Sequence, residues 1–329
     1  MMRRFLTVLH ARNIEFVRDR SALSWGILFP LLLMLGFALI FDAGDQNLYK
    51  VGVIGEGQHS FLESRYIQFI PFDDQSSAII KVERHQLDLL LNLPQQRYWI
   101  NSTSPKGYVV EKMLSASGDT PLQQAVVTGK EIRYIDWLIP GVLGMNMMFS
   151  ALFGIGFVIV RYRKNGVLKR LKGTPLSATE FLLAQIVSRL LLIILVSTLV
   201  FIVCDLILDF AMFGSYWLLF AVLILGALSL ISMGLLVAAR LKSDEVASGV
   251  ANAISMPMML LSGVWFSLEG APEWIIAFAK LLPLTHVVEA ARAIMLDGAG
   301  IAEIGLQLIT LAIMTLLFLF IGVKLFRWD

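Results

Sequence analysis

Long apolar segments constrain the fold of this chain more than any other feature of its sequence. Six stretches are each long enough, at about 20 mostly apolar residues, to cross the hydrocarbon core of a bilayer as a helix. Only 16% of the 329 residues are charged, whereas soluble domains are about 25% charged. The sequence therefore predicts a polytopic α-helical membrane protein with six transmembrane helices, at residues 21–41, 135–160, 181–207, 216–239, 246–266 and 304–323.

Basic residues gather at four places beside these spans, and all four fall on one side of the membrane if there are six spans. Cytoplasmic loops carry such an excess of lysine and arginine. We therefore expect a multi-pass protein with both termini in the cytoplasm and with residues 42–134 and 268–302 outside. The four clusters are Arg18 with Arg20, six basic residues within 161–180, Arg240 with Lys242, and Lys324 with Arg327.

The polar stretch 42–134, between the first two spans, predicts a small extracytoplasmic α/β domain. Short apolar runs indicate its strands, and the stretches between them indicate helices. The expected strands are Tyr49–Ile54, Tyr66–Ile70, Leu87–Leu93 and Arg97–Asn101, and the expected helices are Gln75–Gln86, Gly107–Ala116 and Pro121–Arg133.

Two further segments predict helices at the membrane surface. Residues 1–20 place apolar and charged side chains on opposite faces of a helix, which indicates a cytoplasmic interfacial helix, with a solvated tail as the alternative. Within 268–302, Ala271–Leu282 and His286–Leu296 read as helices too short to span and too apolar for free loops. Re-entrant or membrane-surface helices on the outside fit this segment best.

The cytoplasmic loop 161–180 contains a short amphipathic helix with defined ends. Gly166 opens this helix, and Gly173 and Pro175 end it. A membrane protein that presents a preformed helix to the cytosol has a place to receive a mechanical signal. The apolar face holds Val167, Leu168 and Leu171, and the basic residues Lys169, Arg170 and Lys172 lie around it.

Ionisable residues at membrane depth are candidates for function. Arg189 lies two to three turns into the span 181–207. We expect it to reach the cytoplasmic interface or to pair with Glu15 or Glu180 rather than to contact a substrate. Asn146 and Asn252 are expected to be buried in the bundle and to hydrogen-bond between helices.

His286, Glu289 and Arg292 share one helix stripe at positions i, i+3 and i+6. A proton relay or a metal site is one interpretation, but no third metal ligand is in sight. A mutual salt bridge on the outer surface is therefore favoured.

The sequence shows neither a metal motif nor a catalytic set of residues. Gly129 and Lys130 are followed by Glu131, which rules out a P-loop at this position. We expect no cofactor, metal or catalytic residue on this chain.

Two motifs resemble those of ABC-2 type transporter permeases. Residues 165–177, NGVLKRLKGTPLS, are similar to the family's cytoplasmic pattern G-x-L-x-x-L-x-x-T-P-L-S, although Val167 stands where many members carry threonine. Residues 261–266 (LSGVWF), 272–274 (PEW) and 282–286 (LPLTH) are similar to the pattern before the family's last span. With the six spans and the insert after the first, the resemblance covers the whole chain.

The resemblance implies the membrane subunit of an exporter in the bacterial inner (cytoplasmic) membrane, which is not itself an enzyme. Two such permeases pair, as copies or paralogues, and each binds a cytosolic ABC ATPase that holds ATP and magnesium. A periplasmic adaptor and membrane lipids are further expected partners, and nucleic acid is not. The implied ATPase-coupling residues are Gly166, Val167, Leu168, Lys169, Arg170, Leu171, Lys172, Gly173 and Thr174, and Pro283, His286, Glu289 and Arg292 belong to the implied outer gate.

Methionine and phenylalanine are frequent in the second and fifth spans, which suits an apolar substrate and an adaptable pathway. Ordinary helix packing is the alternative explanation. The favoured function is ATP-driven export of a lipid, drug or other amphiphile by alternating access. A scaffold or signalling protein that binds a ligand through its outer domain, and a membrane enzyme, are the rivals. The candidate pathway residues are Asn146, Met148, Phe149, Asn252, Met256 and Met259.

Overall fold

The computed structural model describes residues 2–18, 27–28, 30–32, 34–35, 49–55, 57, 59–64, 67–117, 122–129, 132–241, 243–266, 268, 271–326 and 328. The chain divides into two compact units. One unit is helical and combines Met1–Ile40 with Ile135–Asp329, and the other is an α/β unit formed by Phe41–Tyr134.

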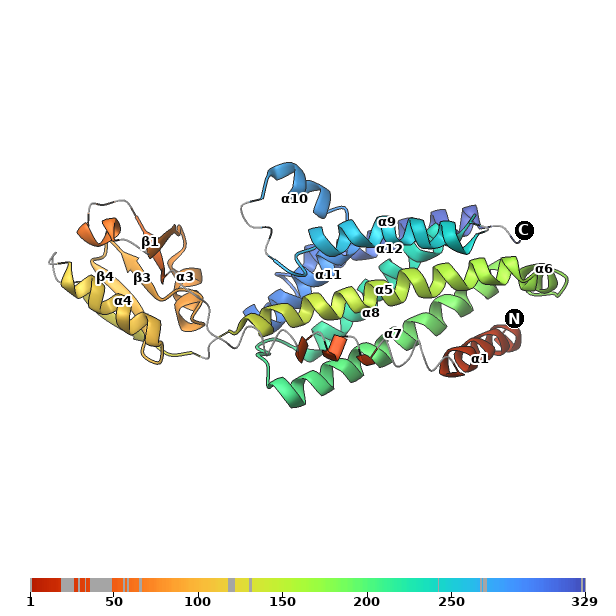
Figure 1. Ribbon diagram of the computed structural model, residues 1–329, viewed down its shortest axis with the longest axis horizontal. Helices are drawn as coiled ribbons and strands as arrows, with labels where there is room; N and C mark the ends of the chain where they lie inside the picture. The colour runs from red at the N-terminus through yellow and green to blue at the C-terminus, as the bar shows by residue number, and fades with distance from the viewer. Residues whose placement is uncertain are drawn as a thin grey trace. The chain divides into compact units, whose positions relative to one another are not determined.

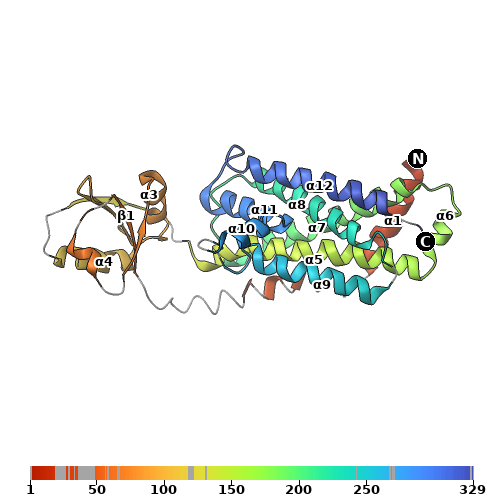
Figure 2. The same cartoon turned by 90° about the horizontal axis from the view of Figure 1, so that it is seen from above.

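Long helices that run side by side form the helical unit (Figure 1). Four of the described helices, α5, α7, α8 and α12, are long and apolar enough to cross a membrane. Both views place α1, α6 and the C-terminus at one end of this unit and α10 at the other (Figures 1 and 2). The elements are α1 (Met2–Arg18), α5 (Tyr134–Lys164), α6 (Val167–Lys172), α7 (Ala178–Leu208), α8 (Tyr216–Ala238), α9 (Asp244–Leu261), α10 (Glu273–Ala279), α11 (Pro283–Arg292), the π-helical turn η2 (Ala293–Asp297) and α12 (Gly305–Leu325).

Helix α8 lies at the centre of this bundle, in contact with α7, α9, α11 and α12. Two of its glycines allow close approach of neighbouring helices. A Cβ atom at Gly234 would lie 3.0 Å from the Ala151 carbonyl oxygen on α5, and one at Gly226 would lie 2.4 Å from Val287 Cγ2 on α11. The hydrophobic effect does not drive helices together in lipid, and small residues at such contacts allow the close van der Waals packing that does.

Three predicted spans, 181–207, 216–239 and 304–323, coincide with α7, α8 and α12 to within three residues at either end. The first predicted span, 21–41, lies mostly outside the described residues, of which 27–28, 30–32 and 34–35 are helical. The count of six spans therefore stays a prediction. Helix α10 and the helical stretch Pro283–Asp297 meet at 94°, and as a pair they are long and apolar enough for one broken span or a re-entrant loop.

Two predicted span boundaries were wrong. Helix α5 continues four residues past 160 to Lys164, so Arg161 to Lys164 belong to the long helix rather than to the loop. Helix α9 ends at Leu261 rather than at 266, because Gly263 adopts the left-handed conformation at φ +69°. The second outer helix also starts earlier than predicted, at Pro283, whose missing N–H costs nothing in a first turn.

The α/β unit is a three-layer arrangement around one five-stranded sheet (Figure 1). The strand order is β2-β1-β3-β4-β5; β3 and β4 are antiparallel and the other neighbours are parallel. Helix α4 and turn η1 pack on the face that carries Leu89 and Leu91, and α3 packs on the face that carries Leu90. Both faces of β3 are therefore buried. The elements are β1 (Tyr49–Ile54), η1 (Ser60–Glu63), β2 (Ile67–Pro71), α3 (Gln75–Glu83), β3 (Leu89–Asn92), β4 (Arg97–Asn101), α4 (Pro105–Ala116) and β5 (Gln123–Val127).

The predicted helix Pro121–Arg133 was wrong, because its described part contains strand β5. Gln123, Gln124 and Ala125 favour a helix, whereas Val126 and Val127 favour a strand. Pairing along the free edge of β4, from Arg97 opposite Gln123 to Asn101 opposite Val127, decides the outcome. The unit is α/β as predicted, and its position outside the membrane stays a prediction.

Candidate functional site

The turn between α5 and α7 contains a short helix with hydrogen bonds at both of its ends. Gly166 lies between α5 and α6 with φ +69°, a conformation that costs other residues about 1–2 kcal/mol. Its N–H donates to the Arg163 carbonyl at 3.1 Å, and its own carbonyl accepts from the Arg170 N–H at 3.1 Å. The glycine thus belongs to the hydrogen-bond ladders of both helices, and it sets the angle at which α6 leaves α5.

Helix α6 is anchored by its apolar face and presents its basic face. Leu168 is 0% exposed, and Val167 and Leu171 are half-buried. The side chains of Lys169, Arg170 and Lys172 are exposed and are not balanced by any acidic residue within α6. The surface that α6 offers to a partner is therefore strongly cationic.

The exit from α6 is also fixed by hydrogen bonds. The Thr174 N–H and hydroxyl donate to the Leu171 carbonyl at 3.0 and 2.6 Å. Ser177 and Glu180 then form a reciprocal capping box that begins α7. The two long helices and the short helix between them are consequently joined without a disordered segment.

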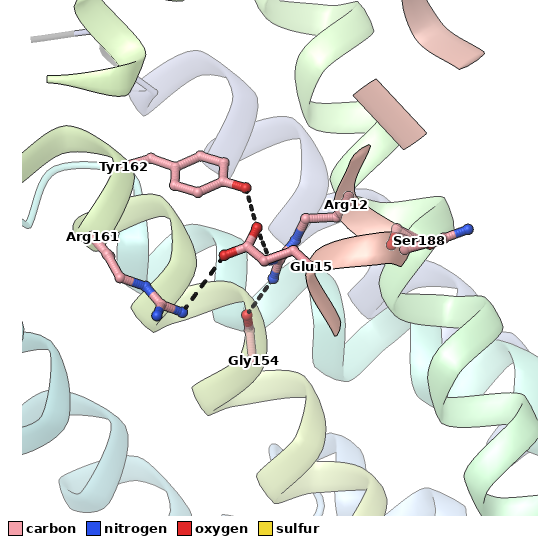
Figure 3. Close-up of polar contacts among 7 residues, drawn as sticks. Arg12, Glu15, Gly154, Arg161, Tyr162 and Ser188 are labelled. Carbon is pink, nitrogen blue, oxygen red and sulfur yellow. Dashed lines mark hydrogen bonds and ion pairs between the residues drawn. The ribbon is translucent and has the colours of Figure 1, made fainter. Parts of the chain in front are cut away.

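A network centred on Glu15 ties α1 to the end of α5 (Figure 3). The Glu15 carboxylate is 2.8 Å from Arg12 Nη1 and 4.0 Å from Arg161 Nη2, and it accepts a hydrogen bond from the Tyr162 hydroxyl. Partial burial raises the pKa of Glu15, but the Tyr162 hydrogen bond and the Arg12 charge together lower it below its usual value. Glu15 is therefore ionised at neutral pH, and the network is charge-assisted.

Further contacts join α1 to α5, to α7 and to the turn before α7. Ser188 Oγ on α7 donates to Asn13 Oδ1 at 2.5 Å, and Arg4 Nη1 donates to the Pro175 carbonyl at 2.5 Å. Arg12 also donates to the Gly154 carbonyl at 3.5 Å. Sequence analysis placed α1 on the membrane surface but missed these contacts. The one available signal was Glu15, an isolated acid on an otherwise basic helix.

Replacing Glu15 by glutamine should loosen α1 without unfolding the bundle. The amide cannot pair with Arg12 and Arg161 as a carboxylate does, and a partly exposed pair of this kind is worth about 1 kcal/mol. We therefore expect amide hydrogen exchange within α1 to rise roughly fivefold. Glu289→Gln is the control, because Glu289 is exposed and forms no ion pair with any described residue. Unchanged exchange in α1 would show that the network does not hold this helix.

The last turn of α5 holds the connection between α8 and α9. The Arg163 guanidinium donates to the carbonyls of Ala238 and Ala239 at 3.2 and 3.0 Å and also to that of Leu241. It therefore satisfies carbonyls that the end of α8 leaves free. Lys164 Nζ lies 2.9 Å from Asp244 Oδ2 in the first turn of α9.

Aromatic rings that pack at a tilt connect the start of α7 with Phe326 and Trp328. The Phe181 ring, which is fully buried, has its centroid 6.1 Å from that of Phe326, 5.6 Å from that of Trp328 and 6.4 Å from that of Tyr162. The carboxyl-terminal residues thus join the same end of the unit as α1 and α6.

The outer helices do not form the predicted salt bridge. His286 is buried and donates from Nε2 to the Lys280 carbonyl at 2.8 Å, whereas Glu289 is exposed. The Arg292 guanidinium lies 3.7 Å from the centroid of the Trp137 ring and donates to the Gly263 carbonyl at 2.8 Å. Because Arg292 turns towards α5 and the end of α9, it holds α11 on the bundle. Pro283 is the first residue of α11.

Comparison with known families agrees with the resemblance of residues 165–177 and of the segments within 261–286. The model of the ABC-2 type transporter family matches residues 88–296, which is more than half of the chain. The chain belongs to this family. It is 25% identical over 336 aligned positions to the protein named probable multidrug ABC transporter permease YbhS of Escherichia coli, with 90% of this chain and 88% of that protein covered.

Two further ABC-2 relatives differ in length from this chain. ABC transporter G family member 20 of Dictyostelium discoideum is 23% identical, with 88% of this chain and 45% of that protein covered. The putative transport permease YvfS of Bacillus subtilis is 26% identical, with 47% of this chain and 63% of that protein covered. The family and its long apolar helices show that the chain is a multi-pass membrane protein.

The residues predicted to line the pathway of this ABC-2 permease differ in their burial within the single chain. Met148 is fully buried, whereas Asn146, Phe149 and Met259 are half-buried. Asn252 and Met256 are exposed, so the expected burial of Asn252 was wrong for the single chain. Phe149 begins a ladder of rings along α5, with centroid separations of 5.8 Å to Phe153 and 5.6 Å from Phe153 to Phe157.

Arg189 is held by a backbone carbonyl group rather than by the predicted acidic partners. Its Nε donates to the Ser150 carbonyl on α5 at 2.7 Å, and its Nη2 donates to the same oxygen. The carboxylate of Glu180 accepts from Ser177, and that of Glu15 is engaged by Arg12, Tyr162 and Arg161. The guanidinium fits because residue 154 is a glycine: a Cβ there would lie 1.8 Å from Arg189 Cζ.

Proposed function

We propose that this chain is the membrane subunit of an ATP-driven exporter that moves a lipid, drug or other amphiphile out of the cytoplasm or the inner leaflet. The observation that carries the proposal is α6, a short cationic helix held rigidly between two 31-residue helices. In this proposal α6 is the coupling helix on which a cytosolic ATPase acts. ATP and magnesium are bound by that ATPase and not by this chain.

The contacts around α6 give a route by which a push becomes a movement of helices. Leu168 anchors α6, and Gly166 joins it to α5 through backbone hydrogen bonds. Glu15 and Arg163 then connect the end of α5 to α1 and to the junction between α8 and α9. A force on α6 would therefore displace the ends of several helices together instead of bending one loop.

Two such permeases would enclose the pathway, so that the chain works as a dimer of copies or paralogues. The half-buried phenylalanine ladder of α5 and the exposed residues Asn252 and Met256 of α9 are the surfaces that we assign to this pairing and to an apolar substrate. Flexible and polarisable side chains suit substrates of variable shape. The name of the Escherichia coli relative, a probable multidrug permease, agrees with an amphiphilic substrate.

Charge reversal on α6 tests the coupling role. The variant Lys169→Glu/Arg170→Glu/Lys172→Glu should reduce the amount of ATPase that co-purifies with the tagged permease from native membranes by at least about tenfold. Three exposed cations would become anions, and like charges facing each other across an interface cost several kcal/mol. Mass spectrometry identifies and quantifies the ATPase.

The matched control reverses three exposed lysines away from α6, Lys106, Lys112 and Lys280. This variant carries the same change in net charge and should retain the ATPase at the parental level. Parental recovery with the α6 variant would instead show that the coupling role is wrong.

A further inference from the structure

A pocket of about 360 Å³ lies within one copy of the chain and is lined by α5, α7, α8 and α11. It is separate from the coupling region and from the residues predicted to line the pathway. Its walls are mostly apolar, and Phe201, Tyr216 and Phe220 supply aromatic rings. Ser197, Thr198 and Asp205 supply polar groups. An apolar pocket with a few convergent polar groups is the usual form of a small-molecule site.

The carboxylate of Asp205 is the charged group of this pocket. Asp205 is half-buried in the last turn of α7, and it forms no ion pair or side-chain hydrogen bond within the described part of the chain. The partial negative charge at a helix C-terminus disfavours an anion at this position and favours a cation beside it. An acidic group near membrane depth is energetically costly, and such a group is therefore a candidate for a functional site.

The aromatic rings of the pocket favour a cation, as the Asp205 carboxylate does. The Phe201 ring stands edge-on to that of Tyr216 with the centroids 6.2 Å apart, and both rings lie in the pocket wall with Phe220. The negative face of an aromatic ring attracts a cation, most strongly where water is excluded. Tyr216 is 57% exposed and Phe220 is 38% exposed, so the pocket opens at the surface of the bundle between α7 and α8.

We propose that this pocket binds an ammonium or phosphonium cation carried on an apolar body, with the charge beside Asp205 and the body between α7 and α8. Two sources supply this chemistry: a free amphipathic cation, and the ammonium headgroup of a membrane lipid. The site is contained within one permease, so the proposal does not depend on the export mechanism or on the ATPase.

Binding of radiolabelled tetraphenylphosphonium to the full chain tests the proposal. The permease is held in nanodiscs of phosphatidylglycerol, which has no ammonium group, and binding to empty discs is subtracted. We expect saturable binding that is at least about tenfold weaker in Asp205→Asn and retained in Asp205→Glu. Asp209→Asn is the matched control, because Asp209 is exposed and does not line the pocket, and it should bind as the parent does.

Each outcome decides the proposal. Equal binding by the parent and Asp205→Asn, or no saturable binding by the parent, overturns it. Thermal unfolding of each variant separates loss of the site from loss of the fold, and Asp205→Glu shows whether the charge or the exact side chain is needed. Discs that also contain phosphatidylethanolamine distinguish the sources: competition assigns the pocket to a lipid headgroup, and unchanged binding assigns it to a free cation. The ATPase co-purification experiment can fail or succeed independently of this result.

Discussion

Replacing Gly166 by proline should abolish most of the coupling between ATP hydrolysis and the permease while the membrane helices remain folded. Proline fixes φ near −65°, whereas Gly166 has φ +69°. Proline also removes the N–H that donates to the Arg163 carbonyl. Helix α6 would leave α5 at a different angle, and its cationic face would no longer be presented as a unit. We expect the stimulation of ATP hydrolysis in the reconstituted complex to fall at least about tenfold.

The two glycines that flank α6 provide the control for this experiment. Gly173 has φ −74°, and a Cβ there would lie 3.4 Å from the Arg170 carbonyl oxygen, which is an ordinary contact. The complex that contains Gly173→Ala should therefore show the parental stimulation of ATP hydrolysis. Gly166→Ala should give an intermediate loss, because a left-handed alanine costs about 1–2 kcal/mol. Parental stimulation with Gly166→Pro would refute the role of α6.

The ends of α6 and its division into two faces could be predicted because they depend on neighbouring residues only. Gly166 stands at one end of the helix in the sequence, and Gly173 and Pro175 stand at the other. Val167, Leu168 and Leu171 have to fall on one side of it at helical spacing. The spans at α7, α8 and α12 were predictable for the same reason, since about 20 consecutive apolar residues have no other stable state in a bilayer.

The polar network could not be predicted, because its partners are far apart in the sequence. Glu15 was expected to be available to Arg189, but Tyr162 and Arg161 reach it from α5 after that helix continues past its expected end. Arg292 was assigned to His286 and Glu289 by helical spacing, yet its guanidinium contacts the Trp137 ring and the Gly263 carbonyl. Strand β5 was likewise decided by the free edge of β4 and not by its own residues.

Replacing Gly154 by alanine should destabilise the helical unit more than its small change in volume suggests. The new Cβ would lie 1.8 Å from Arg189 Cζ, so the guanidinium has to leave its position. It would then lose its hydrogen bonds to the Ser150 carbonyl, and bonds to charged groups are worth about 1.5–3 kcal/mol each. We expect the midpoint of thermal unfolding, followed by tryptophan fluorescence, to fall by roughly 5 °C.

Gly156, two residues further along the same helix, provides the matched control for Gly154→Ala. A Cβ at Gly156 would meet no heavy atom within 4 Å, so Gly156→Ala should be neutral or slightly stabilising. Replacing Arg189 by methionine in the Gly154→Ala background provides a double-mutant cycle. If the guanidinium is the cause, alanine at position 154 should cost little once Arg189 is gone. A loss of the same size in both backgrounds would mean that Gly154 is needed for the path of α5 itself, and that Arg189 reaches the Ser150 carbonyl without its help.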